Sequence, residues 1–121
     1  MNTETIRQLK YLEDFSHRQL DEFIMPFWRT HAVDHEQGGF HGQINNDMEI
    51  IRNAEKGLIL NARILWTFST VYGKFKNEAD LQLAHRAFNY IVRFFYDREN
   101  GGYFWSLNAD GSPHETKKQI Y

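Results

Sequence analysis

A single arginine stands within the most apolar stretch of the chain. Between Lys56 and Lys74, Arg63 is the only charged residue. The apolar residues around it leave no polar face wide enough for a surface helix, which predicts a buried helix: Leu58, Ile59, Leu60, Ala62, Ile64, Leu65, Trp66, Phe68, Val71 and Tyr72. A buried guanidinium keeps its proton, so it needs a carboxylate, several carbonyl groups, or an anionic or hydroxyl-rich ligand in place of water.

Trp66 lies one turn beyond Arg63 on the same side of this expected helix. A planar donor fork beside an aromatic ring suits a sugar, whose hydroxyls accept hydrogen bonds and whose C–H face packs on rings. Neither residue requires a ligand, however. Arg63 can pair with a carboxylate of another helix, and Trp66 can be an ordinary core residue. The residues alone leave both interpretations open.

The six histidines do not form a metal-binding pattern. His31 and His35 are one helical turn apart, but Gly38-Gly39 breaks any helix that would extend toward His41. No HExxH motif is present in the sequence, so we expect loop and surface histidines and no metal or other cofactor.

Two acidic turns, Asp34/Glu36 and Asp97/Glu99, raise the question of a Ca²⁺ site or a catalytic carboxylate pair. Their spacing departs from that of an EF-hand loop. Because they recur at a fixed interval, each time before two glycines, turn chemistry explains them better.

Composition predicts one ordinary domain. The 121 residues are 41% hydrophobic and 16% aromatic, which is enough for a core and too apolar for disorder. A net charge of −2 and a pI near 6.3 argue against nucleic acid and anionic membrane as partners. There is no cysteine, and no signal-peptide or membrane-spanning pattern, so we expect a cytoplasmic protein.

Three helices are expected. The first covers about residues 5–30, with Thr5 as a capping residue and a kink or early end near Met25 caused by Pro26. The second runs from Lys56 or Gly57 to near Gly73. The third begins after the N-cap Asn77 and carries an apolar stripe opposite a polar face that includes Asp80. The stripe consists of Leu81, Ala84, Phe88, Ile91, Val92 and Phe95.

An internal repeat is the strongest organisational signal. The segment from Asp34 through Gly38-Gly39 to Asp47 matches the segment from Asp97 through Gly101-Gly102 to Asp110 at a constant offset of 63 (97 − 34). A short strand is expected at 40–44, and a hairpin turn at 108–111 that Pro113 ends. Each copy would place an amphipathic outer helix before a hairpin and an inner apolar helix.

The repeat also predicts that the fold continues. The offset carries Leu58 to residue 121, where a second inner helix would begin (58 + 63). Since such repeats bury their faces only against neighbours, we expect residues 1–121 to be an incomplete α/α-barrel domain, about its first third.

Four segments together resemble the N-acylglucosamine 2-epimerase family, and within it the cellobiose 2-epimerase branch. They are Phe27-Trp28, GGFHG at 38–42, KGLILNARILW at 56–66 and FYDRENGGYFW at 95–105. The resemblance implies an all-α fold, the N-terminal part of an (α/α)6 barrel with short β-hairpins between outer and inner helices. It also implies a small sugar as substrate, and epimerisation at C2 without metal or redox cofactor.

In that chemistry one histidine removes the C2 proton, an enediolate forms, and a second histidine returns the proton to the opposite face. The resemblance makes Arg63 the active-site arginine, which would stabilise the enediolate charge, and Tyr121 a sugar contact. Asn61 and Trp66 are further substrate-binding candidates. The catalytic histidines match no histidine of this chain, so residues 1–121 alone are expected to be inactive.

Several alternatives remain open. Within the family, the activity can be aldose–ketose isomerisation or N-acylglucosamine 2-epimerisation. An α/α-barrel glycoside hydrolase would need an acid and a base carboxylate, whereas the expected inner helix offers Arg63. A non-catalytic helical-repeat binding module would carry its unusual residues on outer helices instead.

Overall fold

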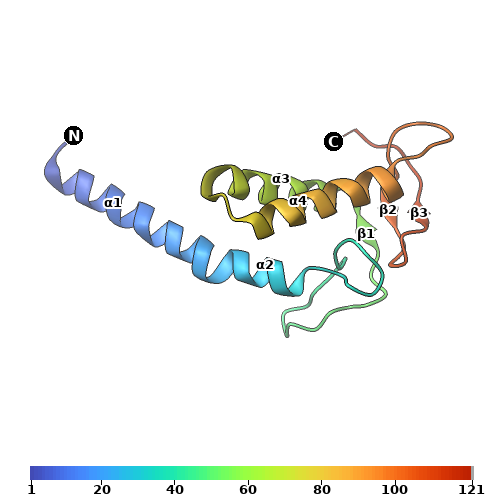
Figure 1. Ribbon diagram of the computed structural model, residues 1–121, viewed down its shortest axis with the longest axis horizontal. Coiled ribbons are helices and arrows are strands. Elements are labelled where there is room, and N and C mark those ends of the chain that lie inside the picture. The colour runs from blue at the N-terminus through green and yellow to red at the C-terminus, as the bar shows by residue number, and fades with distance from the viewer. Residues whose placement is uncertain (121) are drawn as a thin grey trace. The chain divides into compact units, whose positions relative to one another are not determined.

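The computed structural model describes residues 1–120, which fall into two compact units, Met1–His31 and Ala32–Tyr121. The first unit is entirely helical, and the second combines two long helices with a small sheet (Figure 1). Tyr121, the proposed sugar contact, lies outside the described residues. Each unit is described by itself.

The first unit is a run of three consecutive helical segments: α1 (Thr3–Arg18), the π-helical η1 (Gln19–Ile24) and α2 (Met25–His31). Asn2 caps α1, since its side chain accepts a hydrogen bond from the Thr5 N–H at 2.8 Å. The expected cap at Thr5 was therefore wrong, because Asn2 already occupies the capping position three residues earlier.

Pro26 does not end the helix, because α2 continues to His31. Of the two expected outcomes, a kink or an early end near Met25, the early end was wrong. The π-helical segment η1 ends at Ile24, two residues before the proline, and the Met25 N–H donates to the carbonyl of Leu20, five residues back. A proline ring clashes with the carbonyl four residues earlier in a regular α-helix. The wider π turn accommodates that ring, so the chain stays helical.

The second unit is built on a pair of adjacent helices, α3 (Leu58–Phe75) and α4 (Glu78–Tyr90), with the π-helical η2 (Ile91–Phe95) completing the latter (Figure 1). Helix α3 ends at Phe75, two residues beyond the expected Gly73, and its C-cap Lys76 is in the left-handed conformation with φ 58°. The side chain of Asn77 caps α4 as expected, accepting from the Ala79 N–H at 3.0 Å.

Each helix of this pair buries only one face in the described chain. From α3 the buried residues are Asn61, Ile64, Phe68 and Val71, and from α4 they are Asp80, Ala84, Ala87 and Tyr90. The expected stripe on α4 was partly wrong, because Phe88 and Val92 are 52% and 40% exposed while Asp80 is buried. The buried face of α4 includes the small residues Ala84 and Ala87, and it is rotated about the helix axis from the expected apolar stripe.

A three-stranded antiparallel sheet joins the two copies of the repeat. Its strands, in the order β1-β2-β3, are Lys56–Gly57, Ser106–Leu107 and Pro113–Glu115. Pro113 ends the hairpin turn as expected and starts β3, as a proline can at the first position of an edge strand. The expected strand at 40–44 was wrong, since only the isolated bridges Val33↔Phe40 and Ile44↔Ile50 form there.

The two acidic turns have the same backbone structure, which confirms the repeat. In the first, Asp34 donates its N–H to the Gly39 carbonyl at 3.1 Å, and in the second Asp97 donates to Gly102 at 2.9 Å. In both, the aspartate Oδ1 accepts backbone N–H groups two and three residues ahead. All four turn glycines, Gly38, Gly39, Gly101 and Gly102, have positive φ. The repeated Asp and Gly-Gly are therefore structural, as turn chemistry predicted.

Gly39 and Gly102 provide a matched pair for testing how the first turn packs. Their φ angles are 65° and 73°, so alanine adds similar backbone strain at both. A Cβ on Gly39 would lie 2.8 Å from the Tyr90 ring, whereas one on Gly102 would meet only Lys118 at 3.5 Å. We expect Gly39→Ala to destabilise the full-length protein by about 1–3 kcal/mol more than Gly102→Ala. Chemical denaturation measures the difference, and equal effects would contradict this packing.

Candidate functional site

Arg63 and Trp66 lie on the exposed side of α3. Arg63 is exposed and Trp66 is 69% exposed. Among residues 1–120, no group makes a hydrogen bond or ion pair to Arg63. The expectation of a helix buried all round therefore does not hold for the described chain. Both residues are exposed because α4 covers only one face of α3, and Arg63 and Trp66 lie on another face.

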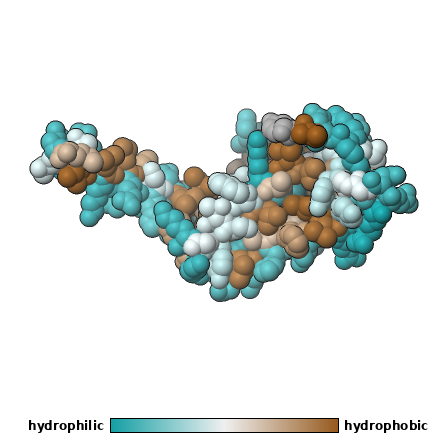
Figure 2. Space-filling model, turned by 90° about the horizontal axis from the view of Figure 1, so that it is seen from above, coloured by the Kyte–Doolittle hydropathy of each residue, from teal (hydrophilic) through white to brown (hydrophobic). Residues whose placement is uncertain are grey.

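The exposed side of α3 is chemically suited to a ligand. It carries one guanidinium and one indole, one turn apart, together with the exposed Lys74 and four small exposed residues: Ala62, Ser69, Thr70 and Gly73. Elsewhere too the unit exposes large hydrophobic residues, including Phe88, Tyr96 and Tyr103. Figure 2 shows one such surface, where hydrophobic residues are interspersed with hydrophilic ones. The structure brings two of the four expected site residues, Arg63 and Trp66, to one face.

Asn61 lies apart from that pair. It is 1% exposed, and its side-chain Nδ2 donates to the Gly57 carbonyl at 2.8 Å, one turn back on the same helix. Its Oδ1 has no hydrogen-bond partner among the described residues. In this structure Asn61 supports the N-terminal turn of α3, so its substrate-binding role stays a prediction.

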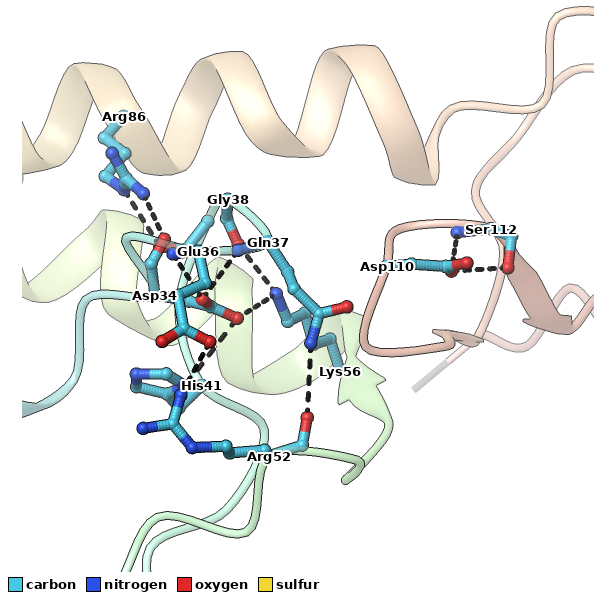
Figure 3. A network of polar contacts seen from close by, with 11 residues as sticks. Asp34, Glu36, Gln37, Gly38, His41, Arg52, Lys56, Arg86, Asp110 and Ser112 are labelled. Atoms are coloured by element: carbon cyan, nitrogen blue, oxygen red, sulfur yellow. Dashed lines mark hydrogen bonds and ion pairs between the residues drawn. The ribbon is translucent and has the colours of Figure 1, made fainter.

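A buried ion pair between Asp34 and Lys56 lies at the start of α3. The Lys56 Nζ donates to Asp34 Oδ2 at 2.9 Å and to the Gly38 carbonyl at 2.6 Å, and the two side chains are 1% and 3% exposed (Figure 3). His41 Nδ1 approaches the same carboxylate oxygen at 3.6 Å. The ammonium also lies 5.4 Å from the centre of the Tyr90 ring.

Helix α4 holds the same turn from a second direction. Arg86 donates from Nε to the Gly39 carbonyl at 2.9 Å and through a terminal nitrogen to the Asp34 carbonyl at 2.6 Å (Figure 3). Tyr90 covers Gly39 and is 4% exposed. The turn that carries Asp34 is thus bound both to α4, through Arg86, and to Lys56, two residues before α3 begins.

The network was not anticipated from the sequence. Asp34 was assigned to a turn and Lys56 to the edge of the apolar helix. A recognisable signal does exist in the second copy, where Lys118 donates to Asp97 Oδ2 at 2.8 Å. The two lysines follow their aspartates by 22 and 21 residues (56 − 34 and 118 − 97). The one-residue difference hides the equivalence from a comparison made at the constant offset of 63.

These contacts shift three pKa values. Burial raises the pKa of the Asp34 carboxyl, but the Gln37 amide and Lys56 together outweigh it, so the net shift is downward. The hydrogen bond from Lys118 holds the pKa of Asp97 well below its usual range. Burial, followed by the charges of Asp34 and Asp110, raises the pKa of Tyr90 to about 12. The two carboxylates therefore stabilise the fold above about pH 4, and that stability is lost as the pH falls further.

The described residues form neither a metal-binding cluster nor a membrane-spanning helix. In residues 1–120 no group of three or more His, Cys, Asp or Glu side chains is placed to hold a metal ion. Within the same residues, no helix combines the length and the apolar character needed to cross a bilayer. The expectations of a cytoplasmic location and of no nucleic-acid partner stay predictions.

Comparison with known proteins decides the family. Residues 38–121 match the family model of N-acylglucosamine 2-epimerase (GlcNAc 2-epimerase). This chain belongs to the N-acylglucosamine 2-epimerase family. It is 48% identical over 104 residues to the cellobiose 2-epimerase of Bacteroides fragilis and 42% identical over 105 residues to that of Eubacterium cellulosolvens. These alignments cover 86% and 87% of this chain but 26% of each relative, so the chain spans about a quarter of their length.

Solved structures of epimerases share the fold. The cellobiose 2-epimerase of Spirochaeta thermophila superposes with a TM-score of 0.88 at 34% identity, over 94% of this chain and 28% of that one. A sugar epimerase from a ruminal bacterium gives a TM-score of 0.80 at 35% identity, over 84% and 26%. The expected fold class, part of an (α/α)6 barrel with short β elements between its helices, is confirmed.

Replacing the Tyr90 hydroxyl tests the electrostatics of the network. The hydroxyl is buried and has no partner among residues 1–120, so its removal leaves no lost hydrogen bond behind. We expect Tyr90→Phe in the full-length protein to be at least as stable as the parent. In the parent, Tyr90 ionises in the unfolded state before it does in the folded state, so the protein loses stability between about pH 10 and 12. The Tyr90→Phe variant should lack this contribution to the loss.

Thermal denaturation over that pH range measures both effects. Tyr103→Phe is the control, because Tyr103 is 41% exposed. A Tyr90→Phe variant less stable than the parent at neutral pH by more than about 1 kcal/mol would show that the hydroxyl has a partner in the protein.

Proposed function

We propose that this chain is part of the catalytic domain of a carbohydrate 2-epimerase that acts on the reducing-end glucose of cellobiose. The observation that carries the proposal is 48% identity with a cellobiose 2-epimerase over 86% of the chain, including the whole of α3 with Arg63. The exposed guanidinium and indole on that helix supply the two kinds of contact that a sugar needs.

The proposed reaction is a proton transfer at C2 of the open-chain sugar. A base takes the C2 proton, the bonding electrons form a C1–C2 double bond, and the carbonyl oxygen becomes negatively charged. Returning the proton to the opposite face of C2 gives the mannose-configured epimer. Arg63 stabilises the enediolate, because a fixed guanidinium in a site sheltered from water interacts most strongly where charge develops.

The remaining candidates bind substrate in this proposal. Trp66 packs on the C–H face of the sugar, Tyr121 contacts its hydroxyls, and Asn61 supports the helix that carries Arg63. The proton-transferring histidines belong to parts of the barrel that this chain does not contain, so residues 1–121 by themselves have no epimerase activity.

Proton NMR of the full-length protein with cellobiose in D₂O tests the reaction. We expect the C2 proton signal of the reducing glucose to disappear while the epimer with mannose configuration accumulates. Appearance of new reducing ends without exchange at C2 would favour a glycoside hydrolase instead. No change with cellobiose, but exchange with mannose or an N-acylated hexosamine, would keep the chemistry and reject the disaccharide.

The role of Arg63 is tested by substitution in the same full-length protein. We expect Arg63→Ala to lower kcat by about 100-fold or more, because one donor to a developing oxyanion contributes on that scale. Arg98→Ala, at an exposed arginine of the second acidic turn, should leave kcat within about twofold. An Arg63→Ala variant with parental kcat would reject the proposed role.

A further inference from the structure

The region before α3 contains a buried cation that the proposed reaction does not use directly. We infer that Lys56 is a positioning residue for Arg63, acting through its buried ion pair with Asp34 to fix where α3 begins. The inference rests on the proposed function, because it concerns how the proposed catalytic arginine is placed.

Lys56 is held so that its backbone has little freedom. Its side chain is 1% exposed, and its ammonium contacts Asp34, the Gly38 carbonyl and the Tyr90 ring. An ammonium out of water is stable only with such partners, since an uncompensated buried charge costs several kcal/mol. A shift of the Lys56 backbone larger than its four-carbon side chain can absorb would break this set of contacts. The side chain therefore fixes the backbone from which α3 starts.

At the start of α3, Asn61 donates to the Gly57 carbonyl within the helix, while Lys56 supplies the buried ion pair that ties this start to the Asp34 turn. The N-cap of α3 is Gly57, which makes no side-chain cap hydrogen bond. Gly57 and Lys56 form β1, paired with Ser106 and Leu107 of β2, and the Leu58 N–H donates to the Trp105 carbonyl at 3.0 Å. Arg63 follows five residues after Leu58, at a rise of about 7.5 Å along the helix axis. Its axial position is thus set by β1.

The packing between α3 and α4 supplies a weaker constraint along the axis. The buried residues of α4 include Ala84 and Ala87, whose side chains are short, and those of α3 include Ile64 and Phe68. Small residues oppose sliding less than interdigitated large ones. Arg86 of α4 binds the Asp34 turn, and Lys56 of β1, which leads into α3, binds it too, so the turn opposes that sliding.

The second copy of the repeat supports the same role. Lys118 pairs with Asp97 in an identical turn, at nearly the same sequence distance as Lys56 from Asp34. A lysine that returns to the acidic turn at the end of the hairpin is therefore a feature of both copies. In the first copy this lysine is Lys56, and α3, the helix with Arg63, begins two residues later at Leu58.

The test compares kcat and KM of Lys56→Met and Asp34→Asn in the full-length protein with cellobiose, well below the melting temperature of each variant. Asp34→Asn keeps an Oδ1 that can accept the Glu36 and Gln37 N–H groups, so it removes the ion pair while retaining the turn. We expect kcat to fall about 10-fold or more in both variants, with a smaller change in KM, because misplacement of Arg63 affects mainly the transition state.

The exposed ion pair of the same turn provides the matched control. Glu36 and Arg52 are 2.6 Å apart, with side chains 69% and 62% exposed. Glu36→Gln should leave kcat within about twofold, because exposed pairs contribute little. A loss of kcat in Glu36→Gln as large as that in Asp34→Asn would show that any disturbance of the turn suffices, and would overturn the specific role of Lys56.

A double-variant cycle separates positioning from general structural support. If Lys56 acts through Arg63, Lys56→Met should lower kcat much less in an Arg63→Lys background than in the parent. Equal fractional losses in both backgrounds, or parental kcat in Asp34→Asn, would overturn the inference. Absence of C2 exchange in the parent, or full activity of Arg63→Ala, would instead reject the proposed function itself.

Discussion

The buried ion pair between Asp34 and Lys56 is the constraint on which the second unit depends. Removing two charges from water is costly, and their attraction compensates only where further hydrogen bonds complete the site. The Asp34 carboxylate receives backbone N–H groups on one oxygen and Lys56 on the other, and Lys56 also donates to the Gly38 carbonyl. A tight turn with two glycines at positive φ satisfies these requirements.

The same arrangement explains why successive copies of the repeat depend on each other. β1, which precedes α3, forms its ladder with β2 of the second copy rather than within its own hairpin. Beneath this sheet, Leu107, Phe95 and Tyr90 form a core cluster against which Leu58 packs. The first inner helix thus takes its starting position from the following copy, which is typical of repeat folds whose units bury their faces against neighbours.

The two sides of α3 have different tasks. The side with Ile64, Phe68 and Val71 packs in the core, and the side with Arg63 and Trp66 is exposed. Chemistry on such a helix requires that the packed side hold the helix rigidly, since small displacements of a charge-stabilising group cost large factors in rate. In the mechanism that we propose, the buried network at the start of α3 meets this requirement.

The sequence by itself determined the helices and the acidic turns, because these depend on local periodicity and on glycine conformation. The family followed from the resemblance of four segments, and the active-site role of Arg63 stays a prediction. Only the tertiary structure decided which face of each helix is buried, since this follows from the partner's shape: the alanines of α4, not Phe88, lie in the core. The pairing of Lys56 with Asp34 was also hidden, because the two residues are 22 positions apart and no local pattern joins them. Pro26 shows the same limit, because local rules alone left a kink and an early end open, whereas a π turn lets the helix continue.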